Sequence, residues 1–263
     1  MTPQALRQFA TDYAAHRQAE GRAYAGEALL ALPYVRTGPL ARQWAVHSRT
    51  FEAFMKMLGP ASGRPLEVLD LGAGNGWLSY RIARAGHRAT ALDIRDDEVD
   101  GLGVAGPFIA RNAGRMRTLV APFEAIPAPT ASFDIAVFNA SLHYATDLAA
   151  VLAEAARVVR PGGRLVILDS PFYRREADGL AMVAEKTAQA TQRFGARAGA
   201  LMALPFIEFL TRERLAAASA DLVLSWRLRR VLYPLWYELR PLTAALQGSR
   251  PPSRFDLWVA ARP

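Results

Sequence analysis

The sequence contains no cysteine and has little histidine. Without cysteine, a disulfide scaffold, a cysteine-ligated zinc or iron–sulfur site and a thiol nucleophile are all excluded. The few histidines are scattered and lack the spacing of metal ligands, so we expect no metal site. These histidines are His16, His47, His87 and His143.

Long apolar runs are also missing. The first residues, "MTPQALRQFATDYAAHRQAEG", contain Asp12 and Glu20 and no apolar core, which argues against a secretory signal peptide. Nowhere does an apolar stretch approach the length that crosses a bilayer. From these features we expect a soluble, cytoplasmic protein without a membrane span.

Lysine is nearly absent, occurring only at Lys56 and Lys186, yet the formal net charge is +8 because arginine is abundant. A basic balance allows nucleic acid or an acidic molecule as partner. The arginines are spread along the chain, however, and the short cluster "RLRR" at 227–230 lacks interleaved stacking aromatics. We therefore favour arginine-rich composition over nucleic-acid binding as the explanation.

Half of the 263 residues (51%) are hydrophobic, which is enough for one large domain with a substantial core. Residues 1 to about 60 have helical periodicity and form a predicted N-terminal helical cap. From residue 61 onward, short apolar runs alternate with helical patterns, which predicts a parallel sheet with helices on both faces. The apolar runs are "LEVLDL", "HRATALDI", "MRTLVAPF", "FDIAVFNAS" and "RLVILDS".

Helix signals separate these runs. "WLSYRIARAG" predicts a helix that stops at Gly86, and "TDLAAVLAEAARVV" predicts a second one that Thr146 or Asp147 caps and "RPGG" ends. After Ser170 the alternation is lost. We predict a helical insert over about 174–218, a strand in "LVLSWRLRRVLYP", a helix in "LWYELRPLTAALQG" and a final strand in "RFDLWVAA".

The stretch "LDLGAGNGW" places three glycines between the first strand and a helix. A phosphate-binding P-loop is excluded because the required lysine followed by serine or threonine is missing. The dinucleotide fingerprint Gly-x-Gly-x-x-Gly needs a glycine where Trp77 stands, which weakens that reading. A merely structural turn would leave three alternating glycines hard to explain.

Asp93 ends the next strand, in "ATALD". A carboxylate at this edge of the sheet is placed to accept hydrogen bonds from both ribose hydroxyls of a bound adenosine. The alternative role is a helix N-cap, which Asp96 is also able to fill. Its place directly at the strand end makes Asp93 the better candidate for a ribose ligand.

Taken in order, "EVLDLGAGNGWLSYRIA", "ALDI", "FDIAVFNASLHY" and "EAARVVRPGGRLVILD" resemble the class I S-adenosylmethionine-dependent methyltransferases. The resemblance is closest to the type-11, quinone-biosynthesis-like group, and it covers residues 64 to 171. It implies a Rossmann-like sheet of seven strands, mostly parallel with an antiparallel last strand. Residues 61–263 would then form the methyltransferase domain, with the helical insert as a lid.

The resemblance also implies S-adenosylmethionine as cofactor and assigns residues to it. Asp93 would hold the ribose, Ile94 would pack on the adenine, and the glycine turn would lie under the methionyl part. Pro122 stands where the family often has an aspartate, so the adenine contact would pass to the Phe123 backbone or to Glu124. The turn residues concerned are Asp70, Gly72, Ala73, Gly74 and Asn75.

The segment "FNASLHYATD" follows the fourth strand and should carry the chemistry. Asn139 would contact the methionyl amino group or simply form a turn. His143 is a candidate general base, because an unperturbed imidazole titrates near neutral pH, but it would equally shape the loop. Tyr144 is the second catalytic candidate, although a wall of the site is its more natural role.

Aromatic residues elsewhere supply candidate substrate contacts. Phe172 and Tyr173 follow the fifth strand, and Trp44 and His47 of the N-terminal helices would close the site against water. For Tyr13 and Tyr24, ordinary helix packing is the preferred interpretation.

The sequence thus predicts a methyltransferase that acts on a small, largely apolar acceptor. Three alternatives stay open: a non-catalytic cofactor-binding subunit, an RNA methyltransferase, and an NAD-dependent oxidoreductase. "NASL" lacks the prolines of the amino-methylating branch, which argues mildly against a nucleic-acid substrate.

Overall fold

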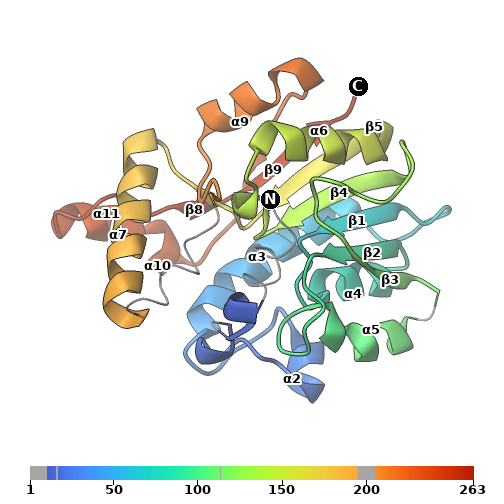
Figure 1. The fold of residues 1–263 in the computed structure, drawn as a ribbon, viewed down its shortest axis with the longest axis horizontal. Helices are drawn as coiled ribbons and strands as arrows, with labels where there is room; N and C mark the ends of the chain where they lie inside the picture. The colour runs from blue at the N-terminus through green and yellow to red at the C-terminus, as the bar shows by residue number, and fades with distance from the viewer. Residues whose placement is uncertain (1–10, 16, 113, 195–204) are drawn as a thin grey trace.

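A seven-stranded sheet organises the computed structural model, which describes residues 11–15, 17–112, 114–194 and 205–263 (Figure 1). The strand order is β3-β2-β1-β4-β5-β9-β7. The strands are β1 (Glu67–Leu71), β2 (Arg88–Asp93), β3 (Met116–Val120), β4 (Phe133–Asn139), β5 (Val159–Leu168), β7 (Arg227–Arg229) and β9 (Leu257–Ala261).

The first five of these strands run parallel, and β9 is antiparallel to both of its neighbours. β9 ends the sheet in sequence but lies between β5 and β7 in space. The expected seven-stranded, mostly parallel sheet with an antiparallel last strand is therefore confirmed. A separate two-stranded pair joins β6 (Pro171–Phe172) to β8 (Arg254–Phe255).

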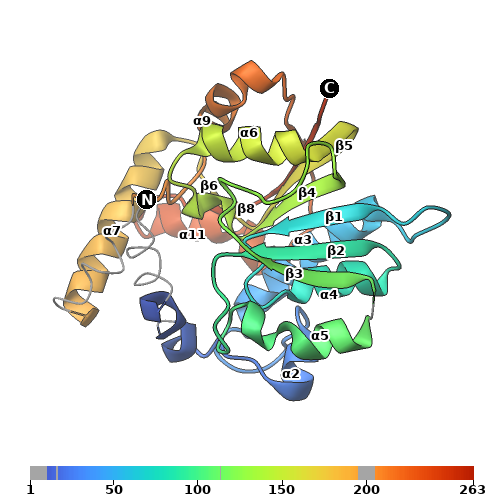
Figure 2. The ribbon, with the colours of Figure 1, turned by 45° about the vertical axis from the view of Figure 1, so that its right-hand side comes forward.

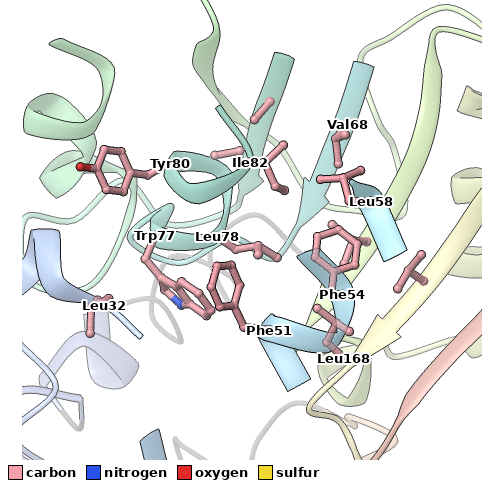
Figure 3. Close-up of a cluster of buried hydrophobic side chains, with 14 of the residues drawn as sticks. Leu32, Phe51, Phe54, Leu58, Val68, Trp77, Leu78, Tyr80, Ile82 and Leu168 are labelled. Atoms are coloured by element: carbon pink, nitrogen blue, oxygen red, sulfur yellow. The ribbon is translucent and has the colours of Figure 1, made fainter. Parts of the chain in front are cut away.

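One face of the sheet is covered by α3 (Ala41–Leu58), α4 (Trp77–Arg84) and α5 (Gly106–Arg111). The predicted apolar face of α3 supplies Phe51 and Phe54, which meet Trp77 and Leu78 of α4 (Figure 3). Alternate residues of the strands complete this core, among them Val68 of β1. α3 is thus part of this core. It is preceded by α2 (Gly26–Ala31), whose Leu29 belongs to the same core, and by helical residues 11–15 and 17–19.

The opposite face packs against α6 (Leu148–Val158) and α9 (Arg212–Ala218), which Figure 2 shows on the far side of the strands from α4 and α5. Asp147, one of the two predicted caps, accepts a hydrogen bond from the Ala150 amide and starts α6. This helix ends one residue before the end predicted from "RPGG". The helix stops at Val158 because Val159 is already paired with Phe133 in the sheet.

The C-terminal third is less regular than predicted. The insert is not one helical region, since non-helical residues 205–210 lie between α7 (Glu176–Phe194) and α9. Residues 195–204 of the predicted insert lie outside the described residues. The strand predicted in "LVLSWRLRRVLYP" shrinks to β7, and the following helix divides into α10 (Leu235–Glu238) and α11 (Arg240–Leu246).

Three short 3-10 turns complete the described part of the chain: η1 (Leu102–Ala105), η2 (Leu142–Tyr144) and η4 (Ala220–Leu222). None of the helices in the described ranges is both long and apolar enough to cross a bilayer. The parallel strands end toward the side where α7 and the N-terminal helical residues stand (Figure 2). This edge carries the candidate site.

Candidate functional site

A cavity of about 800 Å³ opens at the carboxyl edge of the sheet. Its walls come from the ends of β1, β2, β4 and β5, from α3 and the helical residues before it, from α7, and from the segments around Phe206 and Phe255. Open α/β sheets bind ligands at this edge, because their loops converge there. Most of the residues predicted from sequence meet here.

The glycine turn forms the floor of the cavity. Gly72 has φ +70°, and both its amide and that of Ala73 donate to the Leu92 carbonyl, which fastens the turn to the end of β2. A Cβ on Gly72 would lie 2.5 Å from Cβ of Ser141. The close approach that requires a glycine at this position is therefore made by the loop after β4.

Asp93 lies directly beside this turn and is almost completely buried. Its Oδ2 accepts from the Gly74 amide at 2.7 Å, and its Oδ1 accepts from the Arg95 amide at 2.9 Å. Burial raises the pKa of Asp93, while the Arg95 charge and these amides oppose the rise. Since a carboxylate has about four acceptor positions, lone pairs remain for ligand hydroxyls in the cavity.

Asn75 belongs to the same network. Its side-chain amide donates to Asp100 at 2.9 Å, and its carbonyl accepts from the Trp77 amide, which stabilises the start of α4. Asp100 also accepts from Arg17 at 2.6 Å. The N-terminal helical residues are thereby fastened to the loop after β2, whose register the sequence left undetermined.

Ile94, Phe123 and Glu124 also line the cavity, as Pro122 does. Burial raises the pKa of Glu124. Asn139 lines the cavity at the end of β4. The structure therefore brings all the predicted cofactor residues except Asp70 to one surface, and their individual roles stay predictions.

Asp70 does not reach the cavity. It is fully buried beneath the turn, where its Oδ2 accepts from the Ser79 hydroxyl at 2.9 Å. Burial raises its pKa to about 7. The prediction that Asp70 contacts a ligand directly was therefore wrong. Asp70 instead joins β1 to α4 below the floor of the site.

His143 and Tyr144 line the cavity with their rings 4.2 Å apart. Burial, with a smaller effect of Lys186, lowers the pKa of His143 to about 3. Burial also raises the pKa of Tyr144, whose hydroxyl lies 2.8 Å from that of Tyr13. His143 is thus neutral at physiological pH and holds a proton only weakly, so it is a poor general base.

Three of the four predicted substrate contacts line the cavity: Trp44, His47 and Tyr173. The fourth, Phe172, was wrong. Its ring stacks on Trp258 at 5.1 Å in the second core, because β6 turns this side chain away from the cavity. Tyr13 and Tyr24, assigned to ordinary packing from sequence, both line the cavity.

Comparison with known proteins shows which family the central part of this chain resembles. Residues 69–167 match the family model described as "Methyltransferase domain". The matched segment, called the methyltransferase segment below, is 99 of the 263 residues long and resembles a methyltransferase domain. It includes the glycine turn, Asp93 and Asn139, whereas α3 and the segments after β5 lie outside the match.

The methyltransferase segment has curated relatives of similar sequence. A ubiquinone/menaquinone biosynthesis C-methyltransferase of Methylobacterium nodulans is 34% identical over 148 residues, 55% of this chain and 54% of the relative. A malonyl-[acyl-carrier protein] O-methyltransferase of Serratia marcescens is 36% identical over 110 residues, 41% of this chain and 40% of the relative. The chain spans about half or less of the length of these relatives.

Solved structures extend the likeness to the whole methyltransferase fold. Geranyl diphosphate C-methyltransferase of Streptomyces coelicolor A3(2), crystallised with S-adenosyl-L-homocysteine, gives a TM-score of 0.65 at 17% identity and covers 100% of this chain and 99% of its own. The 1,6-didemethyltoxoflavin-N1-methyltransferase of Burkholderia thailandensis gives 0.59 at 19%, covering 100% and 91%. At these identities the likeness shows the fold alone.

Sequence reasoning missed several residues that complete the site around the methyltransferase segment. Asp169 at the end of β5 was passed over, although it ends a buried strand as Asp93 does. Phe206, Arg250 and Phe255 lie in segments without a motif, so only the three-dimensional fold brings them to the cavity.

Proposed function

We propose that this protein transfers the methyl group of S-adenosylmethionine to a small, largely apolar acceptor. The observation that carries the proposal is one cavity with two differently built halves. One half is the glycine turn with Asp93, and the other is a set of aromatic side chains from α3, the residues before it and the segments after β5.

The cofactor half suits an adenosyl group because it offers both hydrogen-bond acceptors and apolar surface. Asp93 keeps acceptor positions for ribose hydroxyls, and the side chains of Ile94 and Phe123 offer apolar surface to a flat base. When bound, S-adenosylmethionine supplies an electrophilic methyl group on a sulfonium. The residues of this chain hold and align that group, and alignment is a large part of catalysis in a displacement reaction.

The acceptor half offers apolar and hydrogen-bonding surface without an excess of charge. Trp44, Tyr144 and Phe255 present aromatic rings. The cations that line the cavity are paired with carboxylates. The ion pairs are Arg17–Asp100, Arg22–Glu20, Arg95–Asp97, Lys186–Glu208 and Arg250–Glu185. This composition favours a neutral, small acceptor over a polyanion such as RNA.

Residues 1–60 and the insert at about 174–218 are proposed to act as cap and lid over this half. Tyr13 and Trp44 contribute from the first region, and Met182 and Lys186 of α7 contribute from the second. Enclosure by these elements would keep water from the reacting groups. The open acceptor half also argues against a non-catalytic subunit, in which that space would be filled.

The test is calorimetric titration with S-adenosylhomocysteine. Asp93→Asn should weaken binding ten-fold or more, about 1.4 kcal/mol or more, because a charged hydrogen-bond acceptor is lost. The matched control is Asp96→Ala, an exposed acid on the same loop that does not line the cavity. Absence of binding by the unaltered protein, or equal weakening in both variants, would refute the proposed cofactor site.

A further inference from the structure

His47 and Asp169 face each other inside the cavity, with Nδ1 of His47 2.7 Å from Oδ2 of Asp169. Both line the cavity and both are buried, with 8% and 2% of their surface exposed. His47 comes from α3, and Asp169 directly follows β5. Neither lies within the residues matched by the family model.

The register of the sheet places Asp169 beside the reacting end of the proposed cofactor site. Asn139 pairs with Leu168, and the Ala140 amide donates to the Leu168 carbonyl, so Asp169 is one strand away from Asn139. Asp93 is three strands away from β5, or ~14 Å at about 4.8 Å per strand. Asp169 therefore lies in the acceptor half.

The backbone is also held in an uncommon conformation at this point. Asp169 has φ +53° and Ala140, on the neighbouring strand end, has the same value. Non-glycine residues in the left-handed region cost energy, and they persist where surrounding contacts fix them, commonly at functional sites. Here the strained position directs a carboxylate toward His47.

The hydrogen-bonding pattern leaves one nitrogen of His47 available. Nδ1 faces Asp169, whereas no hydrogen bond to Nε2 is found among the residues that the structure describes. Rings on two sides hold the imidazole: Phe255 stacks on it at 5.7 Å and the edge of Trp44 meets it at 5.6 Å. A carboxylate on one nitrogen and a free second nitrogen are the arrangement of an oriented general base.

We propose that His47, positioned by Asp169, removes the proton from a hydroxyl of the acceptor, and that the acceptor is a small phenol or enol with a flat, conjugated body. The proposal rests on the proposed function. The rings of Trp44 and Phe255 suit a flat molecule, and because the cations of the cavity are already paired, the acceptor enters neutral and loses its proton in place.

The step balances with the methyl donor of the proposed function. The hydroxyl proton passes to Nε2 of His47, and the oxygen electron pair forms the bond to the methyl carbon. The carbon–sulfur bond breaks and its electrons stay on sulfur, which becomes a neutral thioether. Asp169 balances the positive imidazolium, and its Oδ1 accepts no hydrogen bond from the described residues, so its charge is directed mainly at His47.

Other titratable groups surround the pair. Tyr233 lies beside Asp169, and burial together with the Asp169 charge raises its pKa, so it stays neutral. The charge of Asp256 also raises the pKa of Tyr233, and Asp256 itself pairs with Arg254. From the N-terminal residues, the Tyr24 hydroxyl accepts from Trp44. The remaining histidine of the cavity, His143, has no carboxylate partner within the described part of the chain.

The experiment uses two probes, 4-nitrophenol and 7-hydroxycoumarin, whose ionised forms absorb differently from the neutral phenols. Each is titrated into the protein with saturating S-adenosylhomocysteine, and the ionised fraction of bound probe is read from its spectrum against pH. We expect the unaltered protein to bind them ionised at a pH where the free probes are neutral. His47→Gln should lower the ionised fraction about ten-fold, and Asp169→Asn should do so less.

Turnover gives a second readout, as S-adenosylhomocysteine formed from S-adenosylmethionine and each probe. His47→Gln should lower kcat at least about 100-fold, the usual contribution of a general base, and remove the acid limb of the pH–rate profile. The matched control is His87→Gln, a buried histidine outside the cavity that bonds to the Gly59 carbonyl and the Leu66 amide.

The outcomes separate the two proposals. If His47→Gln lowers only stability, and the ionised fraction and pH profile match the unaltered protein, the pair merely joins α3 to β5 and the proposal is overturned. Binding of S-adenosylhomocysteine without uptake of either phenol overturns the acceptor class alone. Failure to bind S-adenosylhomocysteine refutes the proposed function itself.

Discussion

The two halves of the cavity are assembled in opposite ways. The hydrogen bonds around Asp93 and Asn75 in the cofactor half span at most 25 positions of the chain: they join Asp93 to Gly74 and to Arg95, and Asn75 to Asp100. The acceptor half is built from pairs far apart in sequence, such as Tyr13 with Tyr144, His47 with Asp169, and Tyr173 with Arg250.

This difference separates what the fold supplies from what the individual chain supplies. A local turn keeps its geometry wherever a strand, a glycine turn and a helix follow one another. A pair such as His47 and Asp169 exists only while α3 stays packed on the sheet. Changes in the cofactor half should therefore affect binding of the cofactor, and changes in the acceptor half should affect the second substrate.

The largest effect is expected from Gly72→Ala. The new Cβ would lie 2.5 Å from Ser141, at a backbone φ of +70°. Left-handed strain of about 1–2 kcal/mol and overpacking of about 1–3 kcal/mol add in this variant. We expect the free energy of unfolding to fall by about 2–5 kcal/mol in urea titrations and S-adenosylhomocysteine binding to be lost in calorimetry.

A control separates strain from collision. Gly248 has a similar φ of +62°, but a Cβ there meets nothing within 4 Å. Gly248→Ala should lower the free energy of unfolding by only about 1 kcal/mol and leave the cofactor affinity unchanged. Equal losses in the two variants would show that Gly72 is needed only for its backbone angle.

The next effect concerns the pH dependence of stability and the buried Asp70. Its pKa rises from 3.8 in the unfolded chain to about 7 in the folded protein, because burial disfavours the charged form. Between these values the folded protein keeps a proton that the unfolded chain has lost. The stabilisation by Asp70 is therefore complete below pH 3.8 and is lost as pH rises, by about 1.4 kcal/mol per pH unit.

Asp70→Asn should remove this slope, since an amide keeps an acceptor for Ser79 and does not titrate. The measurement is the difference in unfolding free energy between the two proteins, from urea titrations at pH 5, 6, 7 and 8. Between pH 5 and pH 7 we expect the unfolding free energy of the variant to rise by a few kcal/mol relative to that of the unaltered protein. Above pH 7 the difference should stay constant. A constant difference would contradict the raised pKa.

The smallest effect is expected at a single contact within the acceptor half. Tyr144→Phe removes the hydroxyl that lies 2.8 Å from that of Tyr13, and one such hydrogen bond contributes about 1 kcal/mol. We expect the KM for the acceptor to rise about five-fold while the affinity for S-adenosylhomocysteine stays the same. A matching loss of cofactor affinity would show that the two halves are not separable at this point.

The same division decides what could be predicted from the sequence. The glycine turn, Asp93 and the presence of five parallel strands follow from apolar runs and glycine spacing, which are local patterns. Asp147 as a cap is local too. Phe172 was misplaced because its direction depends on β6 pairing with β8, and Arg254 and Phe255 of β8 are far along the chain. From the sequence, His47 was predicted only as a substrate contact that closes the site. Its partner Asp169 belongs to no motif, so the pair could not be predicted.

One consequence of the strand order concerns how the chain is made. β9 lies between β5 and β7, so its five residues are needed before either neighbour has a partner on that side. Until Leu257–Ala261 leave the ribosome, β5 presents an open edge beside the cavity, and Trp258 is missing from the second core. Open edges invite pairing with other chains. Changes or truncations at residues 257–261 should therefore appear first as a loss of solubility.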